Sequence, residues 1–428
     1  MQRNFYSMKK NLPIILSIAM LSIPAAYGHK VPQRRPITDL NSELLYKSLD
    51  RNTPHQFAGI SKPSFAFASK NSKFVMSVGG FVKLTAGEDI GHPVESPDLM
   101  TTADIPMHDM DGNGAAFKMS ARQTQLYLNM VALPGTADEV GAFVSANLIN
   151  DYVPSLVYAY LRYRGIQAGY DYTLFSDTKA TPSYIDYEGP NAATPIPTTG
   201  IRYTVDFGKE KNWKFAIGAE LPIESYTTTG RLVSVSQRVP DFPVALQYQW
   251  DGGDSWIRAS GVVRNLYYRD APAQSNVDKV GFGVQLSGGI AITPRLTAYY
   301  QGVYGKGIAS YIQDCSGLGL DLCPSADGKS MEAVPAWGAY GALQYQISDK
   351  VSCSGTYSHV RTYADNYGGG TTPRADQYRY AQYVNGNVMW DINSYFYTGV
   401  EYIWGRRVNY DGTKCADNRI QAMVQFAF

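Results

Sequence analysis

Arginine and lysine side chains recur at alternate positions of many short segments, and they are the groups in this sequence best suited to bind a ligand. A guanidinium matches a carboxylate with two parallel hydrogen bonds, and an ammonium attracts the same anions as a point charge. On the polar side of these segments the basic residues outnumber the acidic ones by ten to four, which predicts a surface that attracts small anions. They are Lys83, Arg162, Arg164, Arg202, Lys214, Arg258, Arg264, Arg379, Arg407 and Arg419, with the acidic Asp171, Asp206, Glu220 and Glu401.

The chain as a whole carries no such excess of positive charge. It has 38 basic and 37 acidic residues, and the net charge of +1 falls to −2 if Arg3, Lys9 and Lys10 are removed with a leader. Residues 1–28 read as that leader, because two lysines precede an apolar stretch and a small-residue cleavage site. We therefore expect an exported protein without the bulk basicity of a nucleic-acid binder.

Cysteine and histidine offer fewer options for chemistry. Cys315 and Cys323 lie eight residues apart in a loop, so a disulfide and two unpaired thiols are both open, while the spacing argues against zinc. A hydrolytic barrel would need His beside Ser or Asp, and His359 is the histidine that falls on a predicted strand. The stretch 109–114 begins like a calcium loop, but its twelfth position is Ser120 in place of Glu.

The composition favours extended strands as the elements that position these residues. The 428 residues include 33 Tyr, 16 Phe, 6 Trp and 40 Gly, and only 18% are charged. Disordered chains have fewer aromatic residues and more charge, and helical membrane proteins need apolar runs of about 20 residues, which this sequence lacks.

From Phe74 to Phe428 apolar and polar residues alternate with a period of two. Val82 and Leu84 share one face, for example, and Lys83 lies on the other. This alternation is typical of strands with one apolar and one polar face. Sixteen such segments occur, at approximately 74–87, 115–132, 138–150, 155–164, 165–174, 199–207, 211–221, 242–250, 254–265, 278–291, 294–305, 334–346, 350–363, 377–391, 394–406 and 417–428.

The connections between these segments alternate in length, which a soluble sandwich would not require. Every second one is short, as at 134–136 and 251–253, and the others are mostly long, as at 88–114 and 306–333. Outer-membrane barrels combine short periplasmic turns, long external loops and strands of about 9–11 residues. The sequence predicts an all-β fold, a 16-stranded antiparallel transmembrane β-barrel over 74–428 in the bacterial outer membrane, with long extracellular loops.

Two stretches outside the strands are candidates to enter the barrel. Residues 29–73 form a short N-terminal periplasmic segment with one possible helix near 39–49, which is either a docked plug or a simple tether. The connection 175–198 carries Asp177, Asp186 and Glu188, and it is either an inward-folded constriction or an ordinary external loop.

Several stretches, taken in their order along the chain, resemble the DcaP-like porins. They are 78–84, 120–123, 259–266, 304–308, 311–312, 399–407 and 418–421. The resemblance implies a trimeric 16-stranded channel for dicarboxylates and related anions, with Arg264, Arg407 and Arg419 as the best matches to an arginine-lined constriction. The sequence departs from some relatives because the brief N-terminal segment cannot supply their long coiled coil.

These observations together lead us to expect a passive outer-membrane porin for small hydrophilic solutes, with a preference for anions such as dicarboxylates. We expect no catalysis, cofactor or bound metal; the partners would be outer-membrane lipid, small anionic solutes and two further copies in a homotrimer. A barrel hydrolase and a surface receptor or adhesin remain the alternatives. The expected pore-lining residues are Lys83, Arg202, Arg264, Arg379, Arg407 and Arg419 in the outer half, with Arg162, Arg164, Arg258 and Glu401.

Overall fold

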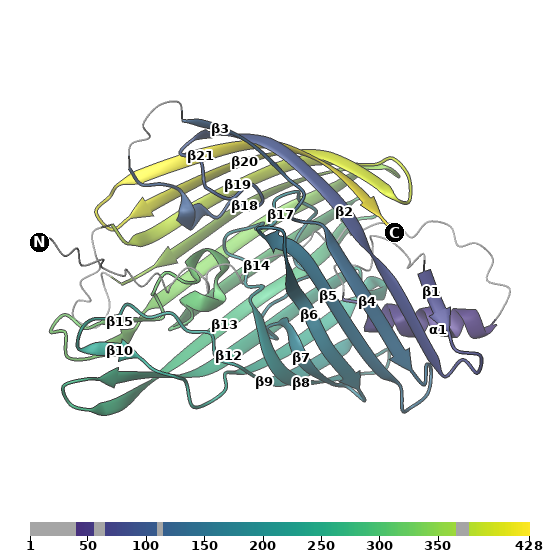
Figure 1. Cartoon of the computed structure of the whole chain (residues 1–428), viewed down its shortest axis with the longest axis horizontal. Coiled ribbons are helices and arrows are strands. Elements are labelled where there is room, and N and C mark those ends of the chain that lie inside the picture. The colour runs from purple at the N-terminus through teal and green to yellow at the C-terminus, as the bar shows by residue number, and fades with distance from the viewer. Residues whose placement is uncertain (1–39, 55–64, 109–113, 365–375) are drawn as a thin grey trace, which may run out of the picture.

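The computed structural model describes residues 40–54, 65–108, 114–364 and 376–428, and one antiparallel sheet closes on itself as a barrel (Figure 1). The first wall strand, β2 (Phe74–Gly91), pairs with the last, β21 (Lys414–Ala427), with Lys83 opposite Gln425. Closure of this kind removes the free sheet edges that a membrane would not tolerate. The predicted 16-stranded all-β barrel is confirmed.

The second strand of the wall is interrupted. Its parts are β3 (Ala115–Ser120) and β4 (Gln125–Ala132), and Arg122 lies in the break, where its guanidinium pairs with Asp98 and Asp151. The break explains why Arg122 does not follow the alternation of its segment. The other wall strands are β5 (Val140–Asn150), β6 (Val153–Tyr163), β7 (Ile166–Tyr172), β8 (Pro197–Phe207), β9 (Trp213–Glu220), β11 (Phe242–Trp250), β12 (Ser255–Asp270), β13 (Ser275–Thr293), β14 (Leu296–Lys306), β17 (Pro335–Ser348), β18 (Val351–Thr362), β19 (Tyr378–Asp391) and β20 (Phe396–Asn409).

Short elements extend the wall or lie within the long connections. Among the described residues no helix is long and apolar enough to cross a membrane. β1 pairs with the start of β2, β10 pairs with the end of β12, and β15 and β16 form a separate hairpin. These elements are β1 (Phe65–Ala68), β10 (Leu232–Ser234), β15 (Leu322–Pro324) and β16 (Met331–Ala333), with 3-10 turns η2 (Thr102–Asp104), η3 (Asp251–Gly253), η4 (Ala309–Tyr311) and η5 (Gln313–Cys315).

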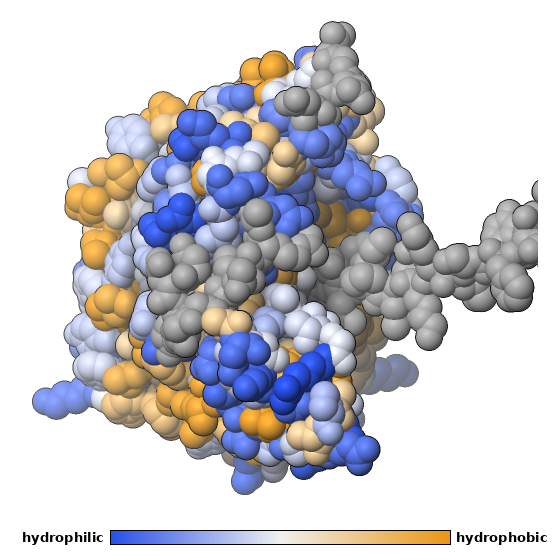
Figure 2. All heavy atoms as spheres, turned by 90° about the vertical axis from the view of Figure 1, so that its left-hand side faces the viewer, coloured by the Kyte–Doolittle hydropathy of each residue, from blue (hydrophilic) through white to orange (hydrophobic). Residues whose placement is uncertain are grey.

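Side chains alternate between the two faces of the wall, as the period of two predicts. Val82 and Phe426 on the outside are 52% and 48% exposed, whereas Lys83 and Gln425 point inward and are buried. Figure 2 looks onto the end that carries the long connections, and hydrophilic residues occupy much of that face while hydrophobic residues gather toward its edges. An apolar exterior and a polar interior are the pattern of a membrane barrel.

The helix α1 (Leu40–Asn52) lies at the opposite end of the barrel, where the chain makes its short turns (Figure 1). Leu49 packs against Val75 and Val131, which are apolar residues on the inner face of β2 and β4. Burial of these three side chains holds the helix against the wall. The structure therefore agrees with the docked alternative for this segment.

Polar contacts fix the C-terminal end of α1. Asn52 Nδ2 donates to Asn129 Oδ1 at 2.7 Å, and Tyr160 Oη donates to the Asn52 carbonyl at 2.8 Å. Arg162 donates to the carbonyl of Arg51 at 2.7 Å, a favourable place for a cation because the helix dipole is negative at its C-terminus. Arg162, expected to line the pore, thus serves to anchor the helix.

Replacing Leu49 with Ala should weaken the docking of α1 by about 2–4 kcal/mol, because a buried leucine leaves a cavity when it is truncated. Limited proteolysis in detergent should then cleave the chain between α1 and the barrel faster than in the parent protein. Tyr46, which is 37% exposed, provides the control, and Tyr46→Ala should leave the cleavage rate nearly unchanged. Equal rates for Leu49→Ala and the parent would contradict the docking.

Candidate functional site: the bore and its inward loops

The connection between β7 and β8 folds into the barrel and touches the wall across its width. We call residues 173–196 the inward loop, and most of them are buried. The backbone amides of Ile185 and Asp186 donate to the Glu401 carboxylate at 2.7 and 2.8 Å, and Lys83 Nζ donates to the Ile185 carbonyl at 3.0 Å. Lys83 and Glu401, both expected to line the pore, therefore hold the inward loop.

Further wall strands hold the same loop through neutral side chains. Gln301 Nε2 donates to the Ala192 carbonyl at 2.8 Å, and Asn387 Nδ2 donates to the Ser183 carbonyl at 2.7 Å. Ser260 Oγ donates to the carbonyl of Phe175 at 2.7 Å. Because buried backbone groups need partners, these bonds make the inward loop part of the folded barrel.

Arg264 joins two other connections and is fully enclosed. Its Nε donates to Asp241 Oδ2 at 3.0 Å, its Nη1 lies 3.3 Å from Asp321 Oδ2, and all three side chains are 0% exposed. Nη1 also donates to the Gly307 carbonyl at 2.7 Å, and the guanidinium lies 4.9 Å from the centre of the Tyr311 ring. Because Arg264 contacts both carboxylates and has no exposed surface, it holds the loops together and does not bind solute anions in the bore.

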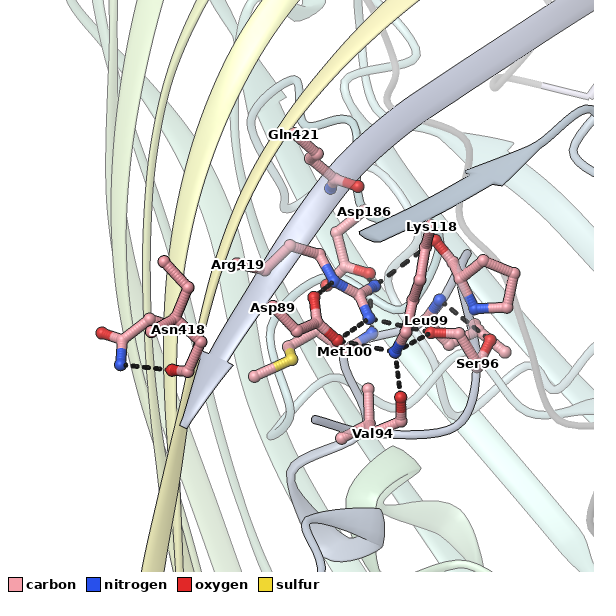
Figure 3. A network of polar contacts seen from close by, with 12 residues as sticks. Asp89, Val94, Ser96, Leu99, Met100, Lys118, Asp186, Asn418, Arg419 and Gln421 are labelled. Carbon is pink, nitrogen blue, oxygen red and sulfur yellow. Dashed lines mark hydrogen bonds and ion pairs between the residues drawn. The ribbon is translucent and has the colours of Figure 1, made fainter. Parts of the chain in front are cut away.

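Arg419 occupies a similar network on the other side of the barrel (Figure 3). Nε and Nη2 donate to the two oxygens of Asp89 at 2.6 and 2.8 Å, which is the bidentate arrangement. Nη2 also donates to the Ser96 carbonyl at 2.8 Å, and Lys118 Nζ pairs with Asp89 at 2.6 Å. The Arg419 side chain is only 2% exposed, so its charge holds the connection 92–105 to the wall.

Arg407 and Arg379 are less enclosed. Arg407 donates to Asn409 Oδ1 at 2.9 Å and to the Ala103 carbonyl, so it also supports an inward connection. Arg379 lies at a register shift of β19, between Tyr378 and Tyr380. The structure thus places the outer-half arginines at loop junctions and does not gather them into one open ring.

A second group of cations lies toward the periplasmic side of the bore, and we call Lys179, Arg202, Lys214 and Arg258 the vestibule patch. Arg202, which we expected in the outer half, is opposite Gln167, the second residue of β7, and so lies nearer the periplasmic turn. Lys214 is opposite Gln247, which is in turn opposite Arg258, so the two cations share one row of the wall. The Lys214 side chain is 42% exposed and its Nζ lies 3.8 Å from Asp206 Oδ1. The ammonium group of Lys214 therefore remains accessible to solvent.

The remaining members of this group are tied to the inward loop or its base. Arg258 donates to the Leu174 carbonyl at 2.6 Å, and Arg202 pairs with Asp171 with 21% of its side chain exposed. Burial, followed by the neighbouring Lys214, lowers the pKa of Lys179. Sequence reasoning missed Lys179, because loop residues carry no periodic signal.

Arg164 does not line the bore in this arrangement. It occupies the tight turn between β6 and β7, where it pairs with Asp138 at 2.7 Å, and both side chains are more than half exposed. Arg164 follows the last residue of β6, so the alternation of that strand no longer determines the direction of its side chain. The sequence pattern assigns it inward by extending that alternation, and the assignment is wrong.

Of the two alternatives left open for Cys315 and Cys323, the structure shows the unpaired thiols. Cys315 and Cys323 are buried and carry no disulfide, which corrects that candidate pairing. Cys315 belongs to η5, and the Cys323 thiol on β15 lies 3.6 Å from Thr227 Oγ1, so each thiol packs within the loop core. Burial raises the pKa of both thiols, which keeps them protonated and unreactive.

The histidine and calcium alternatives gain no support from the described residues. His359 lies 5.1 Å from Trp337 and 5.6 Å from Tyr380 in a stack of rings on the outer face of the wall. Residues 109–113 of the calcium-like stretch lie outside the described residues. Within the part of the chain that the structure describes, no group of three His, Cys, Asp or Glu residues could hold a metal ion.

Buried carboxylates gather where the inward loop meets the other connections. Asp186 accepts hydrogen bonds from Met100 N at 3.0 Å and from Tyr383 Oη at 2.9 Å. Burial and then the neighbouring Glu401 raise the pKa of Asp186 to about 6, against the opposing effect of Arg419. Burial also raises the pKa of Glu188 well above its usual range, so this junction of loops takes up protons in weak acid.

Replacing Arg264 with Gln should leave Asp241 and Asp321 buried without their cation, at a cost of about 3–5 kcal/mol to the packing of the loops. We expect the sheet to stay closed while protease cleaves the connection 307–334 at least tenfold faster. Arg269→Gln is the control, since Arg269 is half-buried and contacts only Asn276 at 3.5 Å among the described residues. Equal cleavage of both variants would rule out this role for Arg264.

A raised pKa for Asp186 means that the packed loop binds a proton more tightly than the opened loop does. The resulting stabilisation is complete below pH 4 and is lost as the pH rises through about 6. Opening of the inward loop, measured by hydrogen exchange corrected for intrinsic rates, should be about tenfold more frequent at pH 7.5 than at pH 5. Asp186→Asn should weaken this dependence and leave the part that Glu188 contributes, whereas Asp349→Asn in a periplasmic turn should preserve all of it. An unaltered dependence in Asp186→Asn would refute the assignment.

The fold and the family of the chain agree with each other. Residues 135–425 match a family model described as the porin subfamily. The outer membrane channel DcaP of Acinetobacter baumannii is 20% identical over 85% of this chain and 99% of that chain, with a TM-score of 0.70. This match confirms the expected DcaP-like fold.

Two further solved structures share the barrel more distantly. An in-vitro folded trimer form of OmpT from Vibrio cholerae is 9% identical, covering 83% of this chain and 99% of that chain with a TM-score of 0.51. The anion-selective porin from Comamonas acidovorans is 8% identical, covering 83% and 100% with a TM-score of 0.53. No curated protein sequence matches the chain. Because the family model spans more than half of its residues, the chain belongs to the porin subfamily and is a β-barrel of the bacterial outer membrane.

Proposed function

We propose that this porin is a passive diffusion channel for small hydrophilic solutes, with a preference for anions such as dicarboxylates. The observation that carries the anion preference is the vestibule patch, because Lys214 keeps 42% and Arg202 keeps 21% of the side chain exposed, while Arg264 and Arg419 are enclosed with carboxylates. Solutes would move down their gradient, and no step of the transport requires a covalent reaction.

The balance of charge around the vestibule patch supports this preference. Arg162 extends the patch through Gln167, whose amide oxygen accepts from Arg162 Nε at 2.7 Å. Five basic side chains then face four acidic ones: Lys179, Arg202, Lys214, Arg258 and Arg162 against Asp171, Asp177, Asp206 and Glu220. In a narrow aqueous passage with low-dielectric walls, even a small excess of positive charge raises the local concentration of anions.

The inward loop supports a role in size selection. Asp177 on this loop accepts hydrogen bonds from Trp256 Nε1 at 3.0 Å and Ser287 Oγ at 2.8 Å, so its charge is held against β12 and β13. A carboxylate fixed on the loop opposite the wall cations produces a field across the passage, which would orient a dipolar solute.

We also propose that the chain assembles as a homotrimer within outer-membrane lipid. The trimer form of the Vibrio cholerae protein shows that a barrel of this kind can adopt that state. Residues 1–28 would be removed on export, so that residues 29–73 remain in the periplasm.

Replacing Lys179 and Lys214 with Gln should lower the permeability ratio of anion to cation about two- to threefold. These lysines are preferred because Arg258 also holds the inward loop. Reversal potentials of single channels in planar bilayers under a tenfold KCl gradient measure the ratio. Lys350→Gln removes one positive charge from an exposed turn and should change little. A double variant with the parent ratio would remove the basis of the proposal.

A further inference from the structure

Two arginines face outward on the wall, near the ends of strands that lead to the extracellular connections. Arg361 is the second-last residue of β18 and lies between Val360 and Thr362, both of which are fully buried on the inner side. Arg406 lies near the end of β20, between Gly405 and the inward Arg407. Strand alternation therefore places both guanidinium groups on the lipid-facing side of the barrel.

The pairing of the strands brings the two arginines into one patch. Arg361 is opposite Tyr380 on β19, while Gln382, two residues further along β19, is opposite Arg406 on β20. The two arginines are thus two strands apart, about 10 Å across the sheet at their backbones, and occupy neighbouring rows. A single headgroup can span that separation because both side chains are long.

Aromatic rings form the floor of this patch. His359 stacks between Trp337, at 5.1 Å and 28°, and Tyr380, at 5.6 Å and 25°. Trp337 Nε1 donates to Tyr363 Oη at 3.0 Å, and the Arg361 guanidinium lies 4.7 Å from the centre of the Tyr363 ring. Aromatic rings with polar edges mark the level of the membrane–water interface.

Arg361 and Arg406 differ from the inward-facing arginines in the groups that balance their positive charge. Arg264, Arg419 and Arg202 each contact an aspartate. Across the described ranges, neither Arg361 nor Arg406 forms an ion pair with a carboxylate, and the Nε of each is enclosed without a hydrogen-bond partner. A cation on the lipid face is tolerated at the interface, and it is neutralised there by anionic groups of the membrane.

We propose that Arg361 and Arg406, above the ring stack of Trp337, His359 and Tyr380, bind the phosphate groups of a phosphorylated glycolipid in the outer leaflet. The planar guanidinium fork matches phosphate oxygens, and the rings pack beneath the sugar and the first part of the acyl chains. The site lies on the outside of the wall, so it is separate from the solute path and does not depend on the selectivity of the bore.

The test measures lipid binding to the detergent-purified full-length protein by native mass spectrometry, with bis-phosphorylated lipid A and its dephosphorylated form as probes. The parent protein should bind the phosphorylated lipid at least tenfold more tightly than the dephosphorylated one. Arg361→Gln with Arg406→Gln should weaken that binding about tenfold or more, since each arginine near an anionic surface contributes about fivefold. The dephosphorylated lipid should bind the parent and the double variant alike.

Arg295→Gln is the matched control, because Arg295 is exposed in a turn at the periplasmic end. It should leave lipid binding unchanged, and an unchanged channel conductance would show that the double variant is folded. Equal binding of phosphorylated lipid by the double variant and the parent overturns the proposal, as does equal binding of both lipids by the parent. A shift of oligomeric state with lipid binding retained would assign the patch to a contact between copies and would equally overturn it.

Discussion

Every charge that this barrel encloses needs a partner inside the barrel, and this constraint organises the structure. The inward loop and much of the connections 92–105 and 307–334 fold inward, which removes their backbone groups and carboxylates from bulk water. Arg264 with Asp241 and Asp321, and Arg419 with Asp89, offset that desolvation by direct ion pairs. From their positions in the strands, these arginines resemble a selectivity ring. Their ion pairs show that they hold the loops in place.

Under the function we propose, selectivity would depend on the charges that loop packing leaves partly exposed. Lys214 keeps 42% of its side chain exposed, and Lys179 lies on the inward loop close enough to influence it. The same loop carries Asp177, which is fixed against β12 and β13. Under this proposed function, a modest positive excess beside a fixed carboxylate would favour anions without binding them tightly, which suits a channel that must also release its solute.

The sequence predicted the wall well and the interior poorly, for a physical reason. The period of two is a property of every strand, so the faces of residues such as Phe426 and Lys83 follow from spacing alone. Asp89 lies at an inward-facing position in the alternation of β2, so its pairing with Arg419 could have been predicted from the spacing. Asp241 and Asp321 lie in connections without periodicity, and nothing in spacing indicates that they meet Arg264. The packing of Cys315 and Cys323 as separate thiols depends on the same unpredictable loop fold.

Arginine has three roles in this wall, and the neighbouring charge distinguishes them. An enclosed arginine with bidentate contacts to an aspartate, such as Arg419, holds a connection against the wall. A partly exposed one beside a single aspartate, such as Arg202, retains field in the aqueous passage. An outward one such as Arg406 forms no ion pair among the described residues, and we propose that its counter-charge comes from the interface of the bilayer. Counting cations on a predicted face therefore overestimates the charge of a pore unless the partners of each cation are known.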